Sequence, residues 1–147
     1  MVKLLLDTNI FIYHFLENPS FVKYTDFLFK NLEKGKFTAI ASIISIIEIF
    51  TGLKIAGDAA LIKEYRDILF NFPNLKIVDT NHDLVDKTSD ISSQFKIRIP
   101  DSIIIATGIH YGCNYFITND ERLIKKFSGI TPVVLSKVMN LEKNENF

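Results

Sequence analysis

Four acidic residues of this sequence lie where a carboxylate needs a physical explanation. Asp7 closes the apolar run at residues 4–6, and Asp120 follows a second run at residues 115–118. Glu48 lies in an isoleucine-rich segment, and Asp101 follows Pro100 at a predicted helix start. Carboxylate oxygens are hard ligands that suit Mg²⁺ or Mn²⁺, whereas the single Cys and the dispersed His residues argue against zinc. The four acids therefore suggest a divalent-metal site, provided that the fold brings them together.

Asp7 and Asp120 are each predicted at the carboxyl end of a buried strand. If the two strands are neighbours in a parallel sheet, their tips lie about 4.7–4.9 Å apart at the backbone. Neighbouring strand ends of this kind form the usual ligand-binding crevice of open α/β sheets. Each Asp could instead simply cap the helix that follows it. Both interpretations remain open at the level of sequence.

Glu48 is the acid that is hardest to explain without a function. Ser45, Glu48 and Gly52 share a narrow arc of a predicted helix that is otherwise largely apolar. A carboxylate in such surroundings is costly unless its charge is compensated, and no Lys or Arg lies between residues 37 and 53. The alternative is an exposed Glu on a thin polar stripe. Asp101, in contrast, is favoured by the helix dipole alone.

Length and composition indicate one domain that needs no disulfide or zinc for stability. The chain has 147 residues, of which 48% are hydrophobic, and its 17 basic and 17 acidic residues cancel. With zero net charge, a nucleic-acid partner would have to be met by a local basic patch. Cys113 is the only Cys, which excludes an intramolecular disulfide and fits a reducing compartment. No apolar segment is long enough for a membrane span, so we expect a cytoplasmic protein.

The elements expected to position the acids are short strands that alternate with helices. Strands are predicted over residues 4–6, 37–41, 75–78, 115–118 and 132–135. Helices are predicted over residues 9–16, 20–34, 42–54, 58–70, 83–95, 101–110 and 120–127. Ser20 and Ser42 are predicted to cap the second and third of these, Asn81 or Thr80 the helix over residues 83–95, and Ser136 a last helix. This alternation is typical of a parallel sheet covered on both faces. We expect one domain over residues 1–142 and a frayed polar tail over residues 143–147.

Four sequence motifs resemble those of a known family. LLLDTNIF around Asp7, EIFTG around Glu48, IPDSIIIATG around Asp101 and FITND around Asp120 resemble a PIN-domain ribonuclease, most closely the VapC-type toxins of toxin–antitoxin pairs. The resemblance implies a three-layer α/β/α sandwich with a five-stranded parallel sheet. It also implies a Mg²⁺- or Mn²⁺-dependent endoribonuclease, which is commonly inhibited by a small antitoxin and commonly a homodimer.

The same resemblance assigns roles to residues. Asp7, Glu48, Asp101 and Asp120 would be the catalytic, metal-binding tetrad, with Asp7 and Asp101 as direct ligands. The supporting polar residues would be Thr8, Asn9, Thr118 and Asn119. Apart from the resemblance, RNA contacts are expected from the basic residues near the predicted active face, which are Lys96, Arg98, Arg122, Lys125 and Lys126. A dimer or antitoxin surface is expected from Phe11, Tyr13 and Phe15.

Other functions fit the sequence less well. A haloacid-dehalogenase-like phosphatase needs a second Asp two positions after the first, where this chain has Asn9. A response-regulator receiver needs an acidic pair after its first strand, and that pair is absent although Lys137 could supply its Lys. No Ser-His or Cys-His arrangement is evident, because His14, His82 and His110 are scattered. A PIN nuclease of RNA processing without a toxin role, or a catalytically silent PIN-fold binding module, remains as an alternative.

Overall fold

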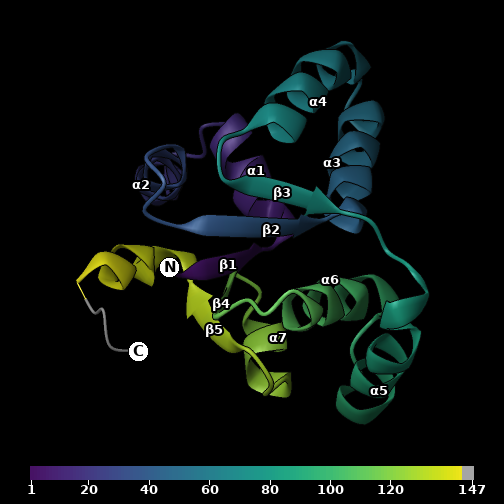
Figure 1. Cartoon of the computed structure of the whole chain (residues 1–147). Coiled ribbons are helices and arrows are strands. Elements are labelled where there is room, and N and C mark those ends of the chain that lie inside the picture. The colour runs from purple at the N-terminus through teal and green to yellow at the C-terminus, as the bar shows by residue number, and fades with distance from the viewer. Residues whose placement is uncertain (144–147) are drawn as a thin grey trace.

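A computed structural model describes residues 1–143 and shows a five-stranded parallel sheet between two layers of helices (Figure 1). The strands are β1 (Lys3–Leu6), β2 (Thr38–Ser42), β3 (Leu75–Val78), β4 (Tyr115–Thr118) and β5 (Thr131–Val134). Their order across the sheet is β3-β2-β1-β4-β5. The three-layer α/β/α fold with a five-stranded parallel sheet is therefore confirmed. The part of the predicted tail beyond residue 143 lies outside the described residues.

Seven α-helices and three short 3₁₀ segments connect these strands within the described chain. The helices are α1 (Thr8–Phe15), α2 (Val22–Glu33), α3 (Ile43–Ile55), α4 (Ile62–Asn71), α5 (Val85–Phe95), α6 (Ile99–His110) and α7 (Glu121–Lys126). The 3₁₀ segments are η1 (Ala59–Leu61), η2 (His82–Leu84) and η3 (Leu135–Glu142). Within residues 1–143, no helix combines the length and the apolar character needed to cross a membrane.

The alternating side chains of β1 show how the sheet supports both layers. Leu4 and Leu6 are fully buried in the core on the side of α1, α2, α3 and α4. Leu5 points the other way and is fully buried in the core on the side of α5, α6 and α7. This alternation follows from the two-residue period of a strand. A central strand buried on both faces is a continuous apolar run in the sequence, as residues 4–6 are.

The winding of the chain reverses between β1 and β4. From β1 the chain proceeds outward through β2 to β3, whereas β4 and β5 lie on the opposite side of β1. Leu6 of β1 pairs with Ile117 of β4, and the Asp7 N–H extends this ladder by donating to the Ile117 carbonyl at 3.1 Å. The predicted adjacency of the two strand tips is confirmed. The crevice of such a sheet lies at this reversal, outside the carboxyl ends of the strands.

Several details of the sequence prediction are wrong. Helix α2 begins at Val22 without a side-chain cap, and the Ser20 N–H donates to Asn18 Oδ1 instead. The last helix is the 3₁₀ segment η3, which also has no side-chain cap, so Ser136 does not start it. Phe11 is fully buried in the core and cannot form a partner surface. Tyr13 and Phe15 are partly buried, each stacked on another aromatic ring.

Candidate active site

Asp7 lies at the tip of β1 and is held by two hydrogen bonds. Its Oδ1 accepts from the Thr8 N–H at 2.9 Å, which caps α1, and its Oδ2 accepts from Thr118 Oγ1 at 2.7 Å. The residue is only 6% exposed. Thr118 ends β4, so the hydroxyl that holds Asp7 comes from the neighbouring strand. Capping and site formation, which the sequence left as alternatives, are compatible because each uses a different carboxylate oxygen.

Glu48 reaches the same point from α3. Thr8 Oγ1 donates to Glu48 Oε1 at 3.2 Å and also lies 3.0 Å from Ser45 Oγ. A hydroxyl has one proton to donate, so the arrangement that satisfies all three groups has Ser45 donating to Thr8 and Thr8 donating to Glu48. Glu48 is partly buried and Ser45 is fully buried. The first two residues of the predicted polar arc, Ser45 and Glu48, therefore face α1, whereas Gly52 is exposed.

Asp101 lies in the first turn of α6 and forms an ion pair with Arg98. Arg98 donates from Nε and from a terminal guanidinium nitrogen to the same oxygen, Asp101 Oδ2, at 3.2 and 3.1 Å. The Asp101 side chain is 14% exposed, whereas that of Arg98 is 74% exposed. An ion pair with one partner so exposed contributes little to stability. Its effect is to orient one oxygen of Asp101 towards the guanidinium.

Asp120 is placed differently from the other three acids. Its Oδ1 accepts from the backbone N–H groups of Arg122 and Leu123 at 3.0 and 3.4 Å, so it caps α7. Its own N–H donates to Thr118 Oγ1 at 3.0 Å. Because the Thr118 hydroxyl also binds Asp7, this threonine connects the two strand-tip acids. Asp120 and Asp101 line one small pocket, so Asp120 lies at the edge of the site.

The electrostatics join three of the acids into one group. Burial is the main cause that raises the pKa of Asp7 to about 6, against the hydrogen bonds from Thr118 and Thr8, and the charges of Asp101 and Glu48 raise it further. Burial also raises the pKa of Glu48; the Thr8 hydroxyl and the Arg98 charge oppose this shift, and Asp101 adds to it. Burial is thus the main influence on the pKa of both Asp7 and Glu48, and the charge of Asp101 acts on both of them in the same direction.

The supporting polar residues divide into two groups. Thr8 and Thr118 contact the acids directly, as described above. Asn9 is exposed, and the Asn119 side chain accepts from the Leu135 N–H at 3.1 Å, which fixes the start of η3. Two contacts were not foreseen from the sequence, those of Ser45 with Thr8 and of Arg98 with Asp101. The available signal was their spacing, since each lies three residues before an acid on a predicted helix or at its start.

The donor set is suited in kind to a divalent cation. It consists of carboxylate oxygens alone, the ligand type that Mg²⁺ and Mn²⁺ prefer, and a cation would relieve the repulsion among the three coupled acids. Across residues 1–143, no three His, Cys, Asp or Glu side chains lie close enough together to enclose a metal ion. A shared ion would therefore require the acids to converge from the positions that they occupy here.

Comparison with known proteins identifies the family. The model of the PIN domain matches residues 4–129, a range that contains all four acids. The chain therefore belongs to the PIN-domain family, whose members are typically nucleases. No curated protein matches the sequence.

Solved structures support the same fold over nearly the whole chain. VapBC2 from Rickettsia felis, bound to a promoter DNA fragment, is 20% identical with a TM-score of 0.69, covering 91% of this chain and 98% of that chain. DNA-bound VapBC from Salmonella typhimurium is 18% identical with a TM-score of 0.70, covering 92% and 99%. A toxin–antitoxin complex from Klebsiella pneumoniae is 22% identical with a TM-score of 0.63, covering 92% and 98%. At these identities the similarity establishes the fold.

Proposed function

We propose that this protein is a divalent-metal-dependent endoribonuclease that hydrolyses RNA phosphodiester bonds, with residues 1–142 forming one nuclease domain. The observation that carries the proposal is the group formed by Asp7, Glu48 and Asp101. Asp7 follows β1, and Glu48 and Asp101 lie on α3 and α6; burial raises the pKa of Asp7 and Glu48, and the charge of Asp101 adds to both shifts. Acids with raised pKa values are typical of functional sites, and these acids lie at the end of the sheet where ligands bind in such folds.

In this proposal Asp7, Glu48, Asp101 and Asp120 hold Mg²⁺ or Mn²⁺. The ion, when bound, supplies the positive charge that favours attack of water on a phosphodiester. Asp7 is kept in place by Thr8 and Thr118, and Glu48 is kept in place by the Thr8 hydroxyl. A catalytically silent PIN-fold module is less well supported, because the helix cap and the hydrogen bond from Thr118 offset the burial of Asp7 only in part, and its pKa remains raised.

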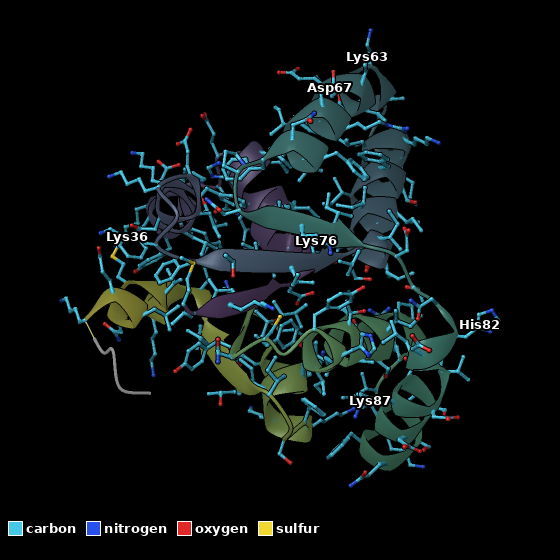
Figure 2. The ribbon with its side chains drawn as sticks, in the orientation of Figure 1. Lys36, Lys63, Asp67, Lys76, His82 and Lys87 are labelled. Carbon is cyan, nitrogen blue, oxygen red and sulfur yellow. The ribbon has the colours of Figure 1, made fainter. Side chains whose placement is uncertain are left out.

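The test is cleavage of structured and unstructured RNAs by the purified protein with Mn²⁺ or Mg²⁺. We expect cleavage by the wild type, loss of cleavage in EDTA, and rates at least about 100-fold lower for Asp7→Asn and Asp101→Asn. Asp67→Asn changes an exposed acid on α4 and serves as the matched control (Figure 2). Equal cleavage by the wild type and both site variants, or cleavage unaffected by EDTA, would refute the site. Single-stranded DNA in parallel reactions tests the preference for RNA.

We further propose that the protein is the toxin of a toxin–antitoxin pair and acts in the cytoplasm as a homodimer. The support is that structures named as VapBC or toxin–antitoxin complexes share its fold over 91–92% of the chain. An apolar groove of about 210 Å³ lies between α1, α3 and α4 and would suit the apolar face of a small partner. Its lining includes Phe15, Ile49 and Tyr65, and neighbouring Leu16 is 65% exposed.

Induced expression in bacteria tests the toxin role. We expect growth arrest with the wild type and none with Asp7→Asn expressed to the same level. Cleavage in vitro without arrest would instead favour a PIN nuclease of RNA processing. Light scattering on the purified protein tests the homodimer, which requires twice the chain mass.

A further inference from the structure

A small pocket beside the acids gathers more positive than negative charge. It has a volume of about 80 Å³ and lies between the start of α6 and helix α7. Asp101 and Asp120 line one part of it, and two apolar side chains also contribute. The remaining lining residues are the cationic Lys96, Arg98, Arg122 and Lys126. Four cations against two carboxylates leave a local surplus in a protein whose net charge is zero.

The arginines and the lysines of this pocket differ in their partners. Arg98 pairs with Asp101 at 3.1 Å, and Arg122 Nε lies 3.6 Å from Asp120 Oδ1. Lys96 and Lys126, by contrast, form no ion pair with any acid of residues 1–143. The one contact between these lysines runs from Lys126 Nζ to the Lys96 backbone carbonyl at 3.4 Å. The unneutralised charge of the pocket therefore belongs to the two lysines.

The backbone holds this arrangement in place. Lys96 ends α5 in the left-handed conformation, at φ 55°, and the chain then turns into α6. Ile97 is buried after this turn, which leaves Lys96 and Arg98 exposed on either side of it. Lys126 ends α7 and reaches back to the turn. The ends of α5 and α7 thus place the positive charges of Lys96 and Lys126 at one pocket. A bound anion would stabilise this arrangement.

We propose that this pocket binds a backbone phosphate of single-stranded RNA, next to the phosphodiester that lies at the acids. Lys96 and Lys126 supply the contacts, and the acidic wall keeps this phosphate at the outer, cationic part of the pocket. The inference rests on the proposed function, because it takes the nuclease substrate as the source of the phosphate. It assigns Lys96 and Lys126 to substrate positioning and leaves the acids to the reaction itself.

The experiment measures RNA binding without cleavage. A fluorescently labelled single-stranded RNA is titrated in EDTA over a series of salt concentrations, and its anisotropy gives the affinity. For the double variant Lys96→Gln/Lys126→Gln we expect about ten-fold weaker binding at low salt. The slope of log affinity against log salt should fall by about 0.7, because each phosphate that a protein neutralises on a single strand contributes about 0.7 to this slope and the pocket binds one phosphate.

Lys30→Gln/Lys63→Gln is the matched control, since it removes the same charge from two exposed lysines. These lie on α2 and α4, which cover the other face of the sheet, and Figure 2 shows Lys63 pointing away from the molecule. The control should bind RNA like the wild type. With Mn²⁺ added, the pocket variant should cleave with a raised KM and a nearly unchanged kcat.

The outcomes separate this inference from the proposed function. If the pocket variant keeps the affinity and salt dependence of the wild type, or if the wild type binds no RNA in EDTA, the phosphate pocket is wrong even where RNA is cleaved. If both double variants weaken binding equally, general charge and not this pocket is responsible, and the inference fails. If the pocket variant alone loses binding while no RNA is cleaved, the pocket stands and the nuclease proposal fails.

Discussion

Asp7 is the residue whose ionisation the fold opposes most clearly. Burial and the charges of Asp101 and Glu48 raise its pKa from 3.8 to about 6, although two hydrogen bonds favour the charged form. The folded state therefore binds more protons than the unfolded chain between these two values. By linkage, the stability of the metal-free protein falls as pH rises through this window, by at most about 3 kcal/mol. Below the window Asp7 is neutral in both states and this loss is absent.

Replacing Asp7 with Asn should therefore stabilise the metal-free protein at alkaline pH. Asn cannot ionise, and its oxygen can still accept from the Thr8 N–H, but it loses the strong acceptor facing Thr118. We expect Asp7→Asn in EDTA to raise the free energy of unfolding by about 1–2 kcal/mol at pH 8. The gain should vanish at pH 4.5. Urea unfolding at the two pH values measures the difference.

Asp67→Asn is the control for this prediction, because it changes an exposed carboxylate on α4. Its effect should be below about 0.5 kcal/mol at both pH values. A loss of stability in Asp7→Asn that is equal at pH 8 and pH 4.5 would show that the hydrogen bonds of Asp7 outweigh its burial. The pKa assignment would then be wrong.

For single residues, the sequence predicted where a residue lies in the fold better than it predicted which residue it contacts. Asp7 and Asp120 could be placed at strand tips because an apolar run followed by an acid is a local pattern. The contact of Thr118 with Asp7 joins residues 111 positions apart and depends on the strand order, which no local pattern contains. Arg98 was predicted to contact RNA, yet its guanidinium binds Asp101. An exposed arginine three residues before an acid is consistent both with contact to RNA and with an ion pair to that acid.

Helix α6 is the element that connects the site to the sheet. It carries Asp101 at its start and packs through Gly108 on Leu5 of β1, the strand that ends at Asp7. A Cβ added at Gly108 would lie 2.5 Å from Leu5 Cδ2 and 3.1 Å from its Cβ and Cγ. Leu5 is fully buried in the core between the sheet and α6. The close approach of α6 and β1 therefore requires glycine at this position.

Gly108→Ala should destabilise the protein although alanine is the better helix former. The overlap with Leu5 costs about 1–3 kcal/mol, against a gain of about 1 kcal/mol in helix propensity. We expect the free energy of unfolding to fall by up to about 2 kcal/mol in urea titrations. Gly52→Ala in α3 is the control, because nothing lies within 4 Å of its added Cβ. That variant should be stabilised by about 0.5–1 kcal/mol; equal effects of the two variants would contradict the packing argument.

The elements themselves were largely predictable, and the errors have physical causes. The predicted strands over residues 75–78 and 115–118 match β3 and β4. For β4, which is buried on both faces, the signal is a short apolar run, whereas β3 is an edge strand with Lys76 exposed. Ser42 and Asn81 cap the elements that follow them, as predicted. Ser20 and Ser136 do not. A serine before a helical pattern can cap only if the chain enters the helix at that residue, and tertiary packing decides that point.

The whole molecule determines whether a site exists at all. Asp7, Glu48 and Asp101 come from three separate segments, and the central position of β1 beside β4 determines how near to one another they lie. The alternation of strands and helices and the resemblance to a family predict that these acids form one site, and this stays a prediction. The sequence could not indicate how closely the acids approach one another, because side-chain distances depend on packing between α3, α6 and β1.

A ligand that binds such a site stabilises the folded protein, because the unfolded chain does not contain the site. In the proposed function Mn²⁺ is such a ligand, and at ten times its dissociation constant it should add about 1.4 kcal/mol of stability. The effect should be larger at pH 8 than at pH 5, since protons compete with the ion for Asp7, whose pKa is about 6. Thermal unfolding at increasing Mn²⁺ measures the shift.

Asp101→Asn should lose most of this Mn²⁺-dependent stabilisation, whereas Asp67→Asn should keep it. The comparison separates binding at the acid group from general binding of Mn²⁺ to surface carboxylates, because both variants remove one negative charge. Stabilisation that is the same in both variants, or that does not grow with pH, would mean that the acids do not converge on an ion. The metal-dependent nuclease would then lose its physical basis.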